Sequence, residues 1–147
     1  MRLTFTKRDG KYDDLVIERE GRPVSTIQCP KQGIIPHDMV HYAVESVLAH
    51  RGFLGLVAGG EAAAFETQGG DSEEAIERLV EGFQAEMRGG RVPAADLLAT
   101  YAIACEARGH PKAPVTEEDV EGVRAKLEEL TDKWAEVPVN GSLTVEF

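Results

Sequence analysis

Apolar residues recur at short, strand-like intervals near the start of the chain. Three runs carry them: Leu3 and Phe5, Leu15 and Ile17, and Val24 and Ile27. The turn-forming sequences Asp9-Gly10 and Gly21-Arg22-Pro23 separate these runs, so we predict a three-strand antiparallel meander. Alternation places the apolar residues of the first two runs on one buried face of this meander. The opposite face is expected to carry their neighbours: Thr4, Thr6, Val16 and Glu18.

The same alternation returns at the end of the chain. After the turn dipeptide Asn140-Gly141, the residues Leu143, Val145 and Phe147 share one face of a predicted strand. An isolated terminal strand would leave its backbone groups without hydrogen-bond partners, so we expect this strand to join the N-terminal meander.

The middle of the chain changes to helical spacing, most regularly after Asp71. Asp71 as N-cap and Glu74 three residues later form a capping-box pattern. Apolar residues then follow at intervals of three and four: Ile76, Leu79, Val80, Phe83 and Met87. Gly89-Gly90 is expected to end this helix.

Three more helices are predicted, over residues 36–52, 93–109 and 116–136. Prolines open the first two, where a fixed φ and a missing amide hydrogen suit the first helical position, and Thr116 caps the third. Residues 53–70 are rich in alanine and glycine and fit either a short helix or a loop. The pattern predicts one α+β domain over residues 1–147, in which a small antiparallel sheet packs against about four helices.

Composition limits the environment and the partners of the chain. Sixteen lysines and arginines against 26 aspartates and glutamates give a formal charge of −10, which repels nucleic acid and anionic membranes. No stretch approaches the roughly 20 apolar residues that cross a bilayer. Two cysteines, Cys29 and Cys105, provide no disulfide framework and are expected to be reduced thiols. We expect a cytoplasmic protein.

The candidate chemistry is concentrated in the first predicted helix. His37, His41 and Glu45 recur every fourth residue, so they share one helical face, and Asp38 lies beside them. Imidazole and carboxylate groups converging on one point are the ligands of a divalent metal such as zinc. The pattern marks the two histidines and Glu45 as candidate metal ligands and Asp38 as a candidate catalytic residue.

The segment His37-Asp38-Met39-Val40-His41 resembles the His-Glu-x-x-His helix of zinc metallopeptidases. The resemblance implies that the two histidines bind zinc and that Asp38 takes the place of the general base. An aspartate holds its carboxylate about one methylene further back than the family's glutamate, which favours metal binding over hydrolysis. The sequence does not identify the third ligand. Glu45 lies on the same face, and the other candidates are His110, Glu77 and Glu81.

Two readings without a metal explain many of the same residues. In the first, the helix dipole selects Asp38 in the first turn, and Glu45 pairs with a half-buried His41 across one turn. In the second, Cys29 and a histidine of this helix form a nucleophile and base pair, although their spacing does not specify one. A thiol before Pro30 is also typical of a strand end.

A wider segment, from Pro36-His37-Asp38 through His41-Tyr42 and Val44-Glu45 to Gly59, resembles small bacterial proteins of uncharacterised function. That resemblance implies a bacterial origin and no reaction.

The sequence therefore supports a protein that binds a small ligand or a divalent metal through its histidine helix. The rival function is protein–protein interaction through the acidic helix 116–136, and a homo-oligomer is compatible with both. The acidic residues of that helix are Glu117, Glu118, Asp119, Glu121, Glu128 and Glu129. Such a face is more often only solvated.

Overall fold

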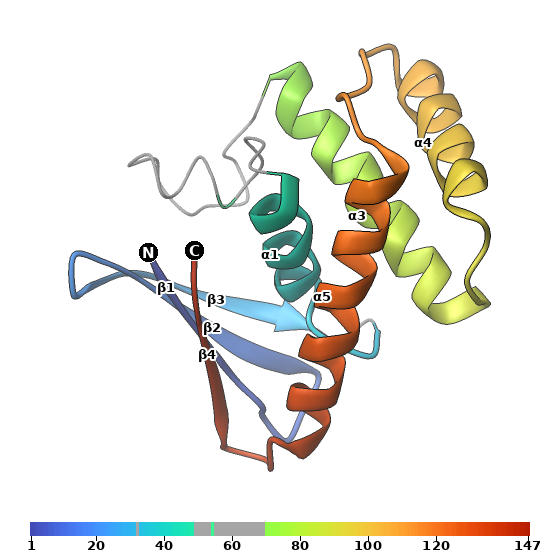
Figure 1. Ribbon diagram of the computed structural model, residues 1–147. Coiled ribbons are helices and arrows are strands. Elements are labelled where there is room, and N and C mark those ends of the chain that lie inside the picture. Colours follow the sequence, from blue (N-terminus) through green and yellow to red (C-terminus); the bar gives the residue numbers. More distant parts are fainter. Residues whose placement is uncertain (32, 49–53, 55–69) are drawn as a thin grey trace.

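The computed structural model describes residues 1–31, 33–48, 54 and 70–147, and confirms the predicted α+β fold. A sheet lies on one side of the molecule and helices cover one of its faces (Figure 1). In chain order the elements are β1 (Arg2–Thr6), β2 (Tyr12–Arg19), β3 (Arg22–Pro30), α1 (His37–Leu48), α3 (Asp71–Gly89), α4 (Ala94–Arg108), α5 (Glu117–Glu136) and β4 (Ser142–Glu146).

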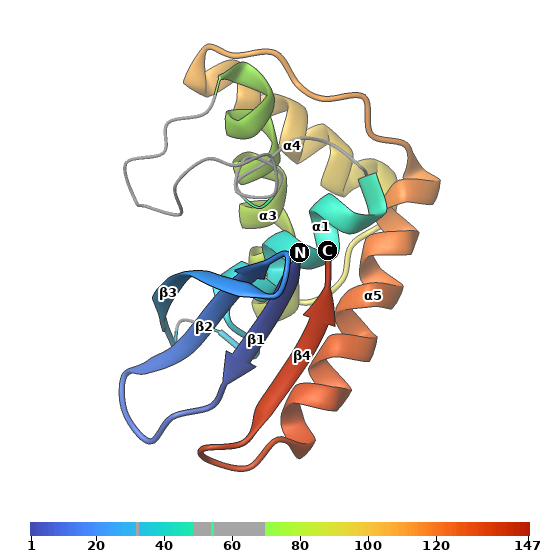
Figure 2. The same cartoon turned by 90° about the vertical axis from the view of Figure 1, so that its left-hand side faces the viewer.

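The sheet has the strand order β3-β2-β1-β4, with every neighbouring pair antiparallel. The C-terminal strand β4 pairs with β1, so the two ends of the chain lie side by side (Figure 2). Leu3 faces Ile17 on β2 and Val145 on β4 in this register. The predicted inner face is confirmed, because four apolar side chains on it are fully buried: Leu3, Phe5, Leu15 and Ile17.

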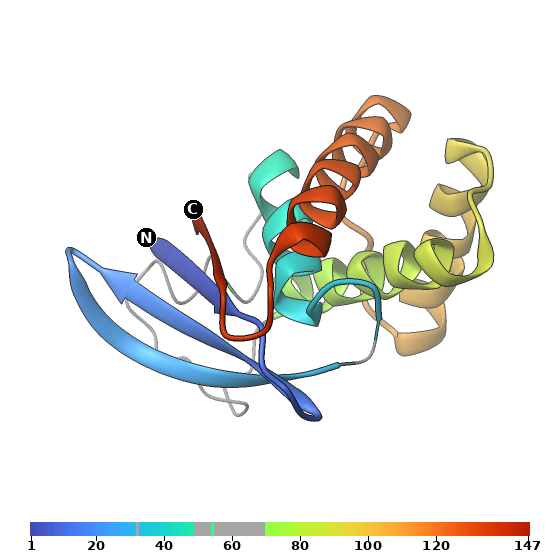
Figure 3. The same cartoon turned by 90° about the horizontal axis from the view of Figure 1, so that it is seen from below.

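Helices α1 and α5 lie next to the sheet, and α3 and α4 lie further from it (Figure 3). Helix α1 contacts β3, α3 and α5, so it is surrounded by other elements on several sides. Seven consecutive residues of α1, from Met39 to Glu45, are buried as a result. Polar side chains in that run are enclosed in the protein and require partners there.

The helix ends follow the predicted signals with two corrections. Pro93 is expected at the first helical position, but it is the N-cap of α4, which begins at Ala94. Thr116 caps α5 in a full capping box with Asp119, and Gly109 ends α4 in the left-handed conformation at φ 74°. The prediction that Asp71 is an N-cap is wrong, since Gly70 holds that position and makes no side-chain cap. Asp71 lies instead in the first turn of α3, where the helix dipole favours a carboxylate.

The described residues bear only partly on two further predictions, the conformation of residues 53–70 and the lack of a membrane-spanning segment. The open choice between helix and loop over residues 53–70 lies almost wholly outside the described residues. Leu54 belongs to that stretch and is buried. Among the helices in the described part of the chain, none combines the length and the apolar character needed to cross a membrane.

Candidate metal centre

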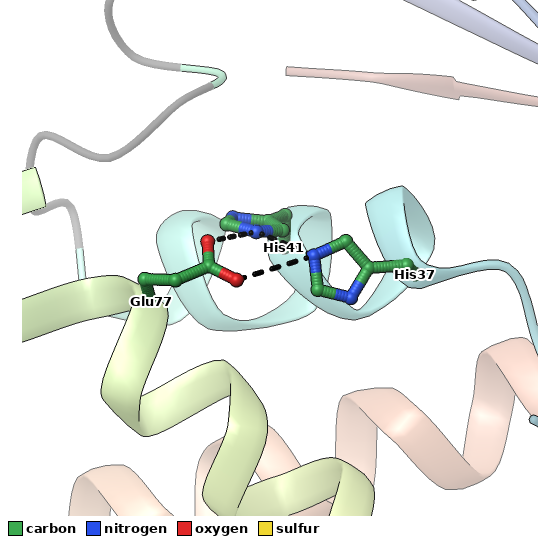
Figure 4. Close-up of side chains that lie close together, drawn as sticks. All are labelled: His37, His41 and Glu77. Atoms are coloured by element: carbon green, nitrogen blue, oxygen red, sulfur yellow. Dashed lines mark hydrogen bonds and ion pairs between the residues drawn. The ribbon is translucent and has the colours of Figure 1, made fainter. Parts of the chain in front are cut away.

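His37 and His41 lie one turn apart on the side of α1 that faces α3 (Figure 4). Their Nε2 atoms are 3.2 Å apart. The two imidazole rings meet edge to face, with centroids 4.8 Å apart. Two ring nitrogens that approach each other this closely either share a proton or bind a common cation.

Glu77 of α3 completes the cluster from the opposite helix (Figure 4). Its Oε2 lies 2.8 Å from His41 Nε2, and its Oε1 lies 3.4 Å from His37 Nε2. One ligand atom from each residue can be chosen so that all three lie within 4.8 Å of one another. Tetrahedral bonds of about 2.05 Å would place ligand atoms about 3.3 Å apart, which is close to the 3.2 Å between the two Nε2 atoms. Each histidine has a different Glu77 oxygen as its neighbour.

Glu45 holds the other nitrogen of the His41 ring. Its Oε2 lies 3.2 Å from His41 Nδ1 and also accepts a hydrogen bond from the backbone N–H of Leu54 at 3.2 Å. The Glu45 side chain is fully buried. A carboxylate at Nδ1 keeps a hydrogen on that nitrogen, so Nε2, which faces Glu77 and His37, is the nitrogen that can exchange its proton for a metal.

The same contacts govern the protonation of the cluster. Burial lowers the pKa of His41, but hydrogen bonds and attraction from Glu45 and Glu77 outweigh it and raise this pKa to about 10. Burial raises the pKa of Glu77, and the two histidines then bring it well below its usual range. Without a metal, His41 is therefore an imidazolium held between two carboxylates.

Asp38 lies beside the two histidines in the sequence, but its carboxylate contacts another group. The Cys29 thiol on β3 donates a hydrogen bond to Asp38 Oδ2, with a distance of 3.1 Å. Burial, assisted by the Asp38 charge, raises the pKa of the Cys29 thiol far above its usual value. A thiol that stays protonated is a poor nucleophile, and its partner here is a carboxylate in place of the histidine of a nucleophile and base pair.

Of the four candidates for a third ligand, only Glu77 is near both histidines among the contacts of the described residues. Glu77 joins the two histidines, whereas Glu45 contacts the far nitrogen of His41. Glu81 forms a two-bond ion pair with Arg78 at 2.9 Å, and His110 Nδ1 lies 3.1 Å from the carbonyl oxygen of Pro111. The sequence signal for Glu77 is weak, since it is only an acidic residue next to the apolar stripe of α3.

Comparison with known proteins adds nothing to this picture. No family model matches the sequence, and neither a curated protein nor a solved structure is significantly similar to it. The interpretation of the site therefore depends on its own geometry and chemistry.

Proposed function

We propose that this protein binds a divalent transition-metal ion, zinc in the first instance, through His37, His41 and Glu77. The observation that carries the proposal is the convergence of three ligand atoms from α1 and α3, which lie within 4.8 Å of one another. Glu45 supports it, because a carboxylate on the second ring nitrogen is the usual arrangement around a metal-binding histidine.

The ligand set also favours a particular class of metal. Two imidazoles and one carboxylate suit zinc, copper, iron or nickel, whereas calcium and magnesium prefer oxygen ligands alone. Glu77, as a ligand, offsets one of the two charges of a divalent ion in this partly buried place, and Glu45 contacts the far nitrogen of the His41 ring. A transition metal therefore fits the cluster better than a hard cation does.

We expect zinc to bind the wild-type protein with a stoichiometry near one, and His37→Ala and Glu77→Gln to lose this binding. Each substitution removes one of the three ligands that the described residues supply, and both side chains are partly exposed, so the fold is expected to persist. Isothermal titration calorimetry on protein purified without a histidine tag measures the stoichiometry and the affinity. Metal analysis of the purified protein measures what it carries.

The matched controls are Glu74→Gln and His110→Ala. Glu74 lies one turn before Glu77 on α3 and its side chain is 53% exposed. Both controls are expected to bind zinc like the wild type, with circular dichroism confirming that every variant is folded. Zinc binding that survives in both ligand variants, or no binding of zinc, cobalt or nickel to the wild type, would refute the proposal.

Glu45 provides a separate prediction about affinity. We expect Glu45→Gln to weaken zinc binding by about 10- to 100-fold and to keep its stoichiometry, because the His41 ring loses its anionic partner and keeps its ligand atom. Competition with a chromophoric zinc chelator measures this change. An affinity within twofold of the wild type, in a folded Glu45→Gln protein, would show that Glu45 does not orient the ligand.

The two rival functions have less support. A zinc hydrolase of the kind that His37-Asp38-Met39-Val40-His41 resembles would need Asp38 to activate water, and its carboxylate is bonded to Cys29. Three of the six acidic residues named for α5 form ion pairs within the chain: Glu128 with Arg91, Glu121 with Arg124, and Glu129 with Lys133. These pairs reduce the negative charge that α5 presents to a basic protein.

A further inference from the structure

The ligand cluster is enclosed on one side and accessible on the other. The side chains of His41 and Glu45 are 4% and 0% exposed, whereas those of His37 and Glu77 are 29% and 33% exposed. His41 thus forms the inner wall of the cluster, and the other two ligands form its rim. A metal held by all three would lie between this wall and the solvent.

The described part of the chain supplies three ligands to this point. Glu45 contacts the Nδ1 side of His41, away from the Nε2 atom that faces the cluster. Asp38 bonds to Cys29. Structural zinc sites use four protein ligands, whereas sites that act on a molecule use three and keep one position for water or substrate. The accessible rim and the three ligands together match the second type.

We propose that the metal keeps an exchangeable position that accepts a small oxygen-donor anion of the carboxylate class. This inference depends on the proposed metal site. A divalent ion with two neutral histidines and Glu77 carries a net charge of +1 in its coordination shell, so one monoanion neutralises it. The carboxylate oxygen forms a bond to the metal as a coordinated water leaves, and the oxidation state of the metal does not change.

The test uses the full chain loaded with cobalt(II), whose visible absorption reports the number and kind of its ligands. Acetate is titrated into the loaded protein, with acetamide as a neutral molecule of nearly the same shape. Perchlorate, a poor ligand, keeps the ionic strength constant. We expect acetate to cause a saturable change in the position and intensity of the cobalt bands, and acetamide to cause none.

The outcomes separate this inference from the proposal on which it depends. If cobalt and zinc fail to bind, the metal site itself is refuted. If cobalt binds and is lost in His37→Ala, but acetate leaves its spectrum unchanged, the metal has no exchangeable position and this inference is overturned. Equal responses to acetate and acetamide would overturn the preference for an anion.

Discussion

Replacing Arg124 by methionine is expected to lower the free energy of unfolding by about 3 to 5 kcal/mol. The Arg124 side chain on α5 is only 4% exposed and reaches toward α3. Its Nε donates a hydrogen bond to Glu86 at 3.0 Å, and its Nη2 donates a second one to Glu86. Nη2 also donates to the carbonyl oxygen of Val92 at 2.6 Å. Methionine fills much of the space and leaves the Glu86 carboxylate, 9% exposed, without its cation. Equilibrium unfolding in urea measures the loss.

A second ion pair in the same part of the fold provides the control. Arg91 and Glu128 have side chains that are 50% and 64% exposed, so Arg91→Met is expected to cost about 0 to 1 kcal/mol. The double variant Arg124→Met/Glu86→Leu is expected to recover most of the stability, because an apolar pair then replaces a buried ionic one. Equal losses for Arg91→Met and Arg124→Met would contradict this interpretation.

The sequence predicts most of the fold because its elements bury one face each. Alternation at Leu3, Phe5, Leu15 and Ile17 specifies the inner face of the sheet, and these four residues are fully buried. The need to pair a terminal strand predicts that β4 joins this sheet, but it does not predict that β4 pairs with β1. The N-cap of α3 is less predictable, since an aspartate is also favoured in the first helical turn, and Asp71 lies there.

The candidate site is only half predictable from sequence. Spacing of four residues brings His37 and His41 together on one helix, and this is a local property. Glu77 reaches the histidines only because α3 packs against α1, and local sequence patterns do not predict this packing. Glu45 shares the histidine face, but one turn further along it meets Nδ1 of His41 instead of the cluster. Asp38 is one residue from His37, about 100° around the helix, and contacts Cys29 on β3.

Metal-free protein is expected to lose about 1.5 kcal/mol of stability as the pH rises from 6.5 to about 8. The pKa of His41 is raised from 6.5 to about 10 in the folded state, against the cost of burial, by Glu45 and Glu77. Between these values the folded protein binds a proton that the unfolded chain has released. The contribution of the protonated His41 to the free energy of unfolding is complete below pH 6.5 and disappears as the pH approaches 10. Urea unfolding in the presence of a chelator, at several pH values, measures the slope.

Below about pH 8, the pH dependence of stability that comes from His41 can be separated from that of two other buried groups. Burial raises the pKa of the Cys29 thiol and of the Tyr101 phenol, so both groups also reduce stability with rising pH, but mainly above pH 9. His41→Gln is expected to flatten the slope, and His110→Ala to keep it. Zinc is expected to reverse its sign, because the metal replaces the proton on Nε2 and binds more tightly as that proton becomes easier to remove. A wild-type slope that persists unchanged in a folded His41→Gln protein would assign the pH dependence to other groups.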